Sequence, residues 1–366
     1  MKVGNLILAC ASIVLLGVLY LLFYPVGIDA AAWTPPPAPK LEGVYAVNQA
    51  LAGVARLGAE VIVGSEDVAV GPDGRLYAGA KDGTIYRLPV EGGTPERFAS
   101  TGGRPLGLKF DQRGHLIVAD CFRGLLDIAP DGTVSVLSTE AGGKPFRFTD
   151  DLDIAADGTI YFTDASWKFG QPEYRLDFLE HRPNGRLLAY EPATKTTRVV
   201  LDNLYFANGV AISPDQQFLV VAETAKYRLL RYWLAGERRG QVEPLIENLP
   251  GFPDGVSTGQ NGVFWVALFA RRNPVLDRLL PQPFWRKMVV RLPRTFQPKP
   301  DHYGFVLGIN DRGKSSETCR TRRPRPLRPS PTWSSTRAAL PGQSGRQGHR
   351  CLSPRTTKVN SNRMGR

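Results

Sequence analysis

Four residues with oxygen-bearing side chains each stand directly before a short apolar stretch. They are Glu66 in GSEDVAV, Asp150 in FTDDLDI, Asn208 in FANGVAI and Asp254 in FPDGVST. Hard divalent cations prefer carboxylate and amide oxygens, and Ca²⁺ accepts about six to eight of them. If the four residues converge, three carboxylates would repel one another unless a cation lies between them. We therefore predict a Ca²⁺ site at these four positions; the alternative is that Asp and Asn serve here only as turn formers.

Other residue types argue against different chemistries. The four predicted ligands include no His or Cys, which is unlike a zinc site. The four histidines of the chain fall in turns, insertions or the tail, and no Ser-His-Asp arrangement is visible. Of the neighbouring acids, we expect Asp151 to support the ligand position, Asp153 to point away, and Glu223 to form a structural ion pair within its own repeat.

A repeated strand motif positions the four residues. An Asp-Gly-like turn followed by an apolar strand recurs as GPDGRLYAGA, DQRGHLIVAD, AADGTIYFTD, SPDQQFLVVA and GQNGVFWVAL. The turn positions Gly74, Gly114, Gly158, Gln217 and Gly262 are separated by 40, 44, 59 and 45 residues. Repeats of about 40–50 residues with several strands each are typical of a β-propeller. The inner strands of a propeller begin near its axis, so we expect the four residues to converge there.

Two insertions interrupt the repeats. The first, residues 167–182, accounts for the longest spacing between turns. The second, residues 270–300, is basic and aromatic, and we expect it to form a lid over the propeller or to touch a membrane surface.

The N-terminal segment predicts a membrane anchor. Residues 6–24 are uncharged and mostly apolar, and 19 residues in a helix come close to crossing a bilayer core of about 30 Å. We expect a signal anchor with the propeller on the non-cytoplasmic side. The alternative is a cleaved signal peptide with a small-residue site at Ala30–Ala32, which would leave the protein secreted or periplasmic. The stretch PPPAP at 35–39 predicts a stiff spacer that holds the globular part off the membrane.

The C-terminal residues have a different composition from the rest of the chain. Residues 312–366 contain 14 Lys and Arg and one acidic residue, a net charge of +13, whereas the whole chain carries +12. This tail has no aromatic interleaving, so we expect no binding to nucleic acid. The change begins where a sixth repeat is due, and our hypothesis is that the reading frame is lost near Lys314. Sequencing the gene through this region in several isolates tests it, and an intact frame with the same codons would contradict it.

These observations predict an all-β fold, a six-bladed β-propeller with its sixth blade missing or disrupted, preceded by a transmembrane helix. The predicted organisation is an anchor at 1–33, a Pro-rich linker at 34–59, the propeller at 60–311 and a basic tail at 312–366. With edge strands exposed by the missing blade, we expect the chain as written to be poorly soluble or inactive.

Several long motifs resemble the strictosidine synthase-like family. They are YFTDAS (161–166), GRLLAYEPATKTTRVVLDNLYFANGVAISPD (185–215), VAETAKYRLLRYWLAG (221–236) and NLPGFPDG (248–255). The resemblance covers residues 64–309 and implies a six-bladed propeller related to gluconolactonases and paraoxonases. It also implies a central Ca²⁺ held by Glu66, Asp150, Asn208 and Asp254, where Asp150 replaces the commoner Asn of the family. The catalytic Glu of the plant synthases lies in the last blade, and no segment after Lys314 matches it.

Three functions follow as hypotheses. The first is a Ca²⁺-dependent hydrolase of aryl esters or lactones, in which the metal polarises the substrate carbonyl and Asp254 or Asp150 acts as base or nucleophile. The second is a strictosidine synthase-type lyase that joins an amine to an aldehyde. The third is a non-catalytic scaffold, tethered to the membrane by its N-terminal helix.

Overall fold

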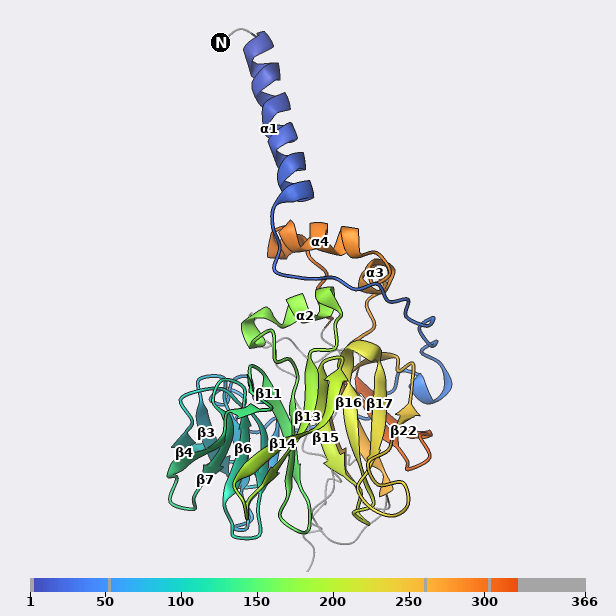
Figure 1. Ribbon diagram of the computed structural model, residues 1–366. Helices are drawn as coiled ribbons and strands as arrows, with labels where there is room; N and C mark the ends of the chain where they lie inside the picture. The colour runs from blue at the N-terminus through green and yellow to red at the C-terminus, as the bar shows by residue number, and fades with distance from the viewer. Residues whose placement is uncertain (1–2, 52–53, 260–261, 302–303, 322–366) are drawn as a thin grey trace, which may run out of the picture.

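The chain folds into an all-β propeller with an apolar helix at its N-terminus (Figure 1). The computed structural model describes residues 3–51, 54–259, 262–301 and 304–321. Within these residues, five four-stranded antiparallel sheets form five blades, and each blade is a simple meander in chain order. The predicted propeller is therefore confirmed, with five blades in the described part of the chain.

The strands of the blades follow one another along the sequence. Blade one comprises β1 (Val68–Val70), β2 (Leu76–Gly79), β3 (Thr84–Leu88) and β4 (Glu96–Ser100). Blade two comprises β5 (Pro105–Phe110), β6 (Leu116–Asp120), β7 (Gly124–Ile128) and β8 (Val134–Ser138). Blade three comprises β11 (Thr149–Ile154), β12 (Ile160–Asp164), β13 (Gly185–Glu191) and β14 (Thr196–Leu204). Blade four comprises β15 (Ala207–Ile212), β16 (Phe218–Glu223), β17 (Arg228–Trp233) and β18 (Val242–Ile246). Blade five comprises β19 (Gly251–Thr258), β20 (Phe264–Arg271), β21 (Gly304–Ile309) and β22 (Ser315–Thr321). A short hairpin, β9 (Glu140–Ala141) with β10 (Lys144–Pro145), joins blades two and three.

The turns of the repeats explain this regularity. Gly74, Gly114, Gly158 and Gly262 have positive φ, which glycine adopts without steric cost. In blade four the equivalent residue is Gln216, with φ 59°, so the sequence assignment of Gln217 was wrong by one position.

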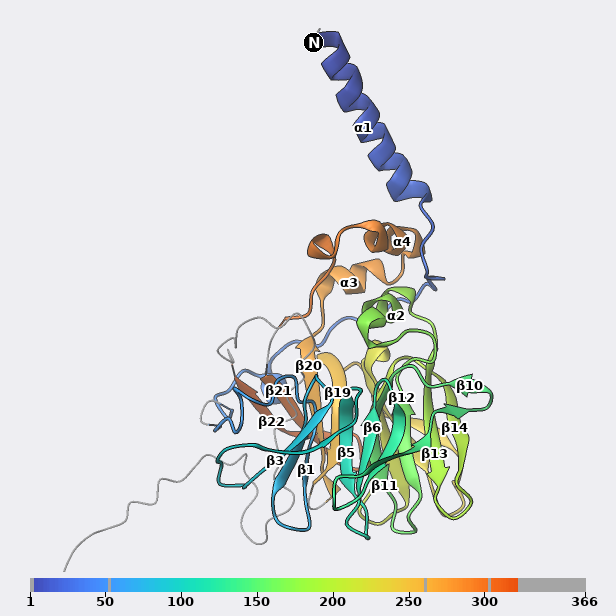
Figure 2. The ribbon, with the colours of Figure 1, turned by 90° about the vertical axis from the view of Figure 1, so that its left-hand side faces the viewer.

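Both predicted insertions lie at one end of the propeller, where they form a helical cap (Figures 1 and 2). Each connects the second strand of a blade to the third. The blade-three insertion contains η2 (Gln171–Glu173) and α2 (Tyr174–Glu180). The blade-five insertion contains α3 (Pro274–Leu279), α4 (Pro283–Arg291) and η5 (Arg294–Phe296). A single turn, η3 (Thr224–Lys226), occupies the same connection in blade four.

The N-terminal helix α1 (Val3–Phe23) has no buried residue and projects away from the cap (Figure 1). By length and composition it is the one helix of the described residues that meets the requirements for crossing a membrane.

The segment after α1 packs against the cap instead of standing off as a free spacer. Ile28 and Ala30 are buried, and Ala31 N donates to Glu180 O at 2.9 Å. Farther along, Arg272 Nη2 donates to Pro36 O at 2.8 Å and Asn248 Nδ2 donates to Pro37 O at 3.0 Å. These hydrogen bonds use carbonyl groups of the Pro-rich stretch. The extended conformation that proline imposes therefore docks this stretch on the globular part instead of holding that part away from α1.

The linker then reaches the outer strand of blade five. η1 (Gly43–Tyr45) is followed by Asn48, whose Nδ2 donates to Thr318 O of β22 at 2.7 Å. Strand β22 itself covers residues that the sequence analysis assigned to the basic tail. The rest of that tail, residues 322–366, lies outside the described residues.

Candidate functional site at the propeller axis

The predicted ligand residues lie in irregular stretches of the inner strands. The pairing of β11, β15 and β19 with their neighbours shifts register around Asp150, Asn208 and Asp254. A β-bulge bends a strand and re-aims a side chain, and such bulges are common beside active sites. Asn208 and Gly209 thus lie inside β15 and do not form the turn that an Asn-Gly pair commonly favours.

Carboxylates on the second strands hold the starts of the inner strands. Asp164 Oδ1 accepts a hydrogen bond from Phe148 N at 3.0 Å. Glu223 Oε1 accepts one from Tyr205 N at 2.8 Å. Glu223 also pairs with Arg228 at 2.5 Å, which confirms its predicted structural role. The residues just before Asp150 and Asn208 are therefore fixed by charge-assisted hydrogen bonds.

The acids next to Asp150 link blade three to blade four. Asp151 Oδ2 accepts from Val210 N at 2.8 Å, and Asp153 Oδ2 accepts from Ile212 N at 2.9 Å. Asp153 also pairs with Lys109 at 2.8 Å. Gly209 is required here, because a Cβ at this position would lie 2.3 Å from Val256 N. The inner strands of blades four and five therefore approach too closely for any side chain at Gly209.

Glu66 forms a buried ion pair with an arginine that the sequence analysis did not single out. Arg104 Nη2 lies 2.7 Å from Glu66 Oε1 and also donates to Gly64 O at 3.1 Å. Both residues are buried. Arg104 comes from the start of blade two, in the motif GRPLG, whose basic residue was the available signal. A guanidinium therefore supplies positive charge beside the Glu66 carboxylate.

The remaining three predicted ligands come from consecutive blades. Asp150, Asn208 and Asp254 are buried, with exposed fractions of 4%, 2% and 3%. Asn208 Oδ1 is a buried acceptor without a hydrogen-bond partner, which normally costs about 1–3 kcal/mol. In the described residues no group of three or more His, Cys, Asp or Glu is arranged for a metal. The types of these three side chains, two carboxylates and one amide, are ones that a hard divalent cation accepts, and the four-residue Ca²⁺ site with Glu66 stays a prediction.

Cys121 is a further residue at the axis. It is buried, and burial together with the carboxylates of Asp150 and Glu66 raises the pKa of its thiol. The thiol is therefore kept neutral among negative groups, and it packs as a small apolar side chain.

An aromatic layer separates this polar cluster from the cap. Phe148, Phe206 and Phe252 each stand two residues before Asp150, Asn208 and Asp254. Their rings meet Phe178 of α2 or one another. The centroid distances are 4.8 Å for Phe178–Phe206, 5.6 Å for Phe178–Phe252 and 5.3 Å for Phe148–Phe206. The repeated Phe-x-Asp/Asn pattern is the sequence signal for this layer.

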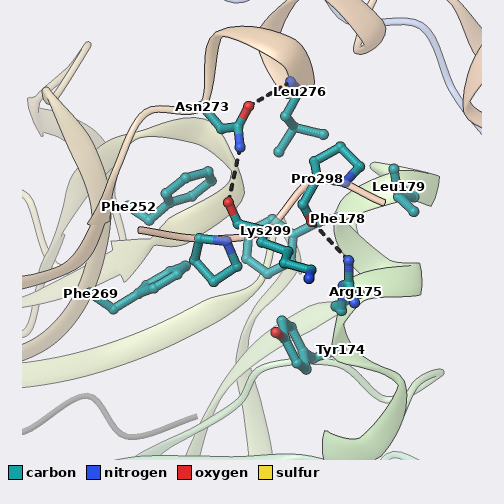
Figure 3. Close-up of a pocket in the computed structure, with 11 residues that line it drawn as sticks. Tyr174, Arg175, Phe178, Leu179, Phe252, Phe269, Asn273, Leu276, Pro298 and Lys299 are labelled. Carbon is teal, nitrogen blue, oxygen red and sulfur yellow. Dashed lines mark hydrogen bonds between the residues drawn. The ribbon is translucent and has the colours of Figure 1, made fainter. Parts of the chain in front are cut away.

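A pocket opens on the cap side of the aromatic layer (Figure 3). Phe178 and Phe252 belong to both, and Tyr174, Phe269 and Leu276 add further apolar surface. The cavity volume of the pocket is about 60 Å³, and the pocket is open to solvent on one side. Phe252 lines the pocket, whereas Asp254, two residues later on β19, does not. The predicted site and the pocket are therefore neighbours along β19, with phenyl rings between them.

The rim of the pocket is held by two hydrogen bonds and carries positive charge. Arg175 Nη2 donates to Pro298 O at 2.8 Å, and Asn273 Nδ2 donates to Lys299 O at 3.1 Å (Figure 3). These bonds fasten the segment after η5 to both α2 and α3. Arg175 and Lys299 are the charged residues of the lining, and both are cationic.

Comparison with known proteins agrees with this architecture. The chain matches the strictosidine synthase family over residues 150–237 and the strictosidine synthase-like N-terminal family over residues 43–88. It is 39% identical to the protein strictosidine synthase-like 6 of Arabidopsis thaliana, covering 65% of this chain and 65% of that protein. It is 35% identical to the adipocyte plasma membrane-associated protein of Rattus norvegicus, covering 82% of this chain and 85% of that protein. The chain thus spans about two thirds of the length of the plant relatives.

The solved structures it resembles share the fold. A gluconolactonase from Xanthomonas campestris superposes with a TM-score of 0.53 at 19% identity, covering 80% of this chain and 86% of that one. Regucalcin from Agrobacterium tumefaciens, described as a calcium-binding protein, superposes with a TM-score of 0.50 at 14% identity, covering 72% and 77%. From its motifs, its blades and these relatives, the chain belongs to the strictosidine synthase-like family of β-propeller proteins.

Proposed function

We propose that this protein is a membrane-anchored, Ca²⁺-supported hydrolase of aryl esters or lactones. The observation that carries the proposal is the position of the apolar pocket beside β19, the strand that bears both Phe252 and Asp254. An aromatic pocket with a cationic rim suits a substrate with an aryl or acyl body and an electron-rich carbonyl end. The lactonase fold of the structural neighbour is consistent with this choice but shows the fold alone.

Asp150, Asn208 and Asp254 would hold the cation. Bound Ca²⁺ would polarise a carbonyl oxygen as a Lewis acid. Asp254 follows Phe252 on β19, and we assign it the role of base toward water or of nucleophile, with Asp150 as the alternative. Glu66 is the fourth proposed ligand, and its Oε1 is also paired with Arg104.

The aromatic layer determines how a substrate reaches Asp254. Phe178 is carried by α2, outside the blades, and contacts both Phe206 and Phe252. Displacement of Phe178 would connect the pocket to the axis while the inner strands stay in place. The cap helix is thus the element whose motion we expect to control access.

Ester and lactone hydrolysis by the full chain in detergent or nanodiscs tests the proposal. We expect turnover of phenyl acetate or a γ-lactone, a fall in kcat/KM of about 10²-fold or more in Asp254→Asn, and no change in Asp202→Asn. Asp202 is exposed on β14 and serves as the matched control. Dialysis against a chelator should lower the rate, and added Ca²⁺ should restore it. Turnover that survives both chelation and Asp254→Asn would contradict the mechanism.

The non-catalytic scaffold is the second candidate, and the burial of the axial residues favours it. If no ester or lactone is turned over while the folded protein retains a partner in pull-down experiments, the scaffold replaces the hydrolase. Condensation of an amine with an aldehyde by the same preparation would instead support the lyase.

We also propose that α1 is a single-pass anchor with the propeller on the non-cytoplasmic side. The docking of Ile28, Ala30 and Ala31 against the cap supports retention of this segment, because cleavage at Ala30–Ala32 would remove packed residues. The six-bladed ring remains our proposal for the intact architecture, with the sixth blade disrupted beyond Lys314. The contrast in charge between the blades and the tail supports it.

A further inference from the structure

Helix α4 presents two aromatic residues outward and one arginine inward, while its Val289 and Val290 pack against the core. Phe284 and Trp285 are 54% and 50% exposed, whereas Arg286 is fully buried. Arg286 Nη1 donates to Leu179 O at 2.9 Å and Glu180 O at 3.3 Å, and its Nη2 donates to Ala31 O. A helix that faces water normally has the reverse arrangement. The outward face of α4 therefore suits a surface less polar than water.

Helix α4 also adjoins the end of the predicted membrane anchor. Arg291, its last residue, donates from Nε to Tyr24 O at 2.6 Å and from Nη1 to Leu21 O at 2.9 Å. Tyr20 Oη donates in turn to Arg291 O at 3.2 Å. These bonds satisfy carbonyls at the C-terminal end of α1, where a positive charge is favourable. Figures 1 and 2 show α4 lying across this end of α1, between α1 and the propeller.

The segment around α4 is strongly basic. Residues 271–299 contain eight Lys and Arg and one acid, Asp277. Asp277 is already bonded to Arg272 at 2.9 Å and to Tyr227 at 2.8 Å. Arg278 and Arg294 are exposed on α3 and η5. Exposed aromatic residues beside exposed cations match the boundary between acyl chains and anionic headgroups.

We propose that α3 and α4 form a membrane-surface dock, in which Phe284 and Trp285 enter the headgroup region of an anionic bilayer and Arg278 and Arg294 face its phosphates. The proposal rests on α1 crossing that bilayer. It adds a second, peripheral contact that orients the cap, and with it the pocket beneath α3, against the membrane surface. A bilayer is favoured over a protein partner because α4 is bonded to the end of the anchor itself.

Fluorescence quenching by brominated lipid tests the dock. The full chain is reconstituted into vesicles of phosphatidylcholine and phosphatidylglycerol, with and without brominated acyl chains. Helix α1 contains no tryptophan, so the anchor itself gives no signal. We expect Trp285→Phe to remove most of the lipid-quenchable emission, whereas Trp233→Phe, on β17 of blade four, retains it. Far-UV circular dichroism of each variant verifies that the fold is intact.

The outcomes separate the dock from the anchor. If the protein floats with the vesicles but wild type and Trp285→Phe are quenched equally, the dock is overturned and the proposed anchor is retained. Failure to float would overturn both. We further expect Arg278→Glu combined with Arg294→Glu to reduce Trp285 quenching by at least half in anionic vesicles. Equal quenching of this variant and wild type there would overturn the role of anionic headgroups.

Discussion

At the scale of single residues, Arg104 changes the interpretation of the axial cluster. Its ion pair with Glu66 joins residues 38 positions apart and is shielded from water on all sides. Removing one partner of such a pair leaves an uncompensated buried charge, which typically costs about 3–5 kcal/mol. Loss of one partner therefore destabilises the fold by more than the attraction within the intact pair stabilises it.

A double-mutant cycle measures this coupling. We expect Arg104→Met to destabilise the protein by about 3–5 kcal/mol, and Glu66→Gln in the same background to recover part of that loss. Chemical unfolding of the four proteins in detergent gives the coupling energy. Strictly additive effects of the two substitutions would show that the ion pair does not stabilise the axis.

At the scale of elements, α2 is fastened to the propeller by a buried polar cluster. Asp177 Oδ2 accepts from Ser166 Oγ at 2.6 Å and from Asn184 Nδ2 at 3.1 Å. Burial raises the pKa of the Asp177 carboxyl to about 7. Glu180, one turn later, pairs with Lys168 at 2.5 Å. The helix that carries Phe178 is therefore held in part by the Asp177 carboxyl, whose pKa lies near neutral pH.

The stability of the protein should depend on this titration. The pKa of Asp177 is higher in the folded state than in the unfolded state, so the folded state binds more protons between pH about 4 and about 7. The free energy of unfolding therefore falls as pH rises through this window and becomes constant above it. We expect Asp177→Asn to gain stability relative to wild type between pH 5 and pH 8, as measured by thermal unfolding in detergent. Asp202→Asn is the control, and a pH-independent difference for Asp177→Asn would refute the assignment.

At the scale of the whole molecule, α1, the segment that follows it and the cap form one connected unit. Arg286 binds α4 to the end of α2 and to Ala31 in the segment after α1. Trp33 N donates to Leu280 O at 3.1 Å, and its ring stacks on His181 at 4.6 Å. The propeller is thus held close to the end of α1, and the Pro-rich stretch does not separate them.

Loss of Arg286 should release this unit. We expect Arg286→Ala to make residues 25–37 at least tenfold more sensitive to limited proteolysis, because local opening then costs less free energy. Arg239→Ala, an exposed change in the turn after β17, is the matched control. Mass spectrometry of the first fragments locates the cut, and equal cleavage rates in both variants would show that Arg286 does not hold the linker.

The amino-acid sequence by itself determined the repeated architecture, the two insertions, the apolar N-terminal helix and the candidate oxygen donors. Turn glycines, β-branched strands and an uninterrupted apolar segment are local signals, and each acts within a few residues. The Phe-x-Asp/Asn pattern is equally local, so the aromatic layer could have been predicted from the sequence.

Only the tertiary structure decided which side chains surround those donors and what covers them. Arg104, at the start of blade two, pairs with Glu66, at the start of blade one. Register shifts lie around Asp150, Asn208 and Asp254. Helix α2 brings Phe178 against Phe206, which stands just before β15. The docking of the Pro-rich linker likewise depends on Arg272 and Asn248, more than 200 residues away. Such contacts arise from packing between segments distant in sequence, and periodicity along the chain carries no information about them.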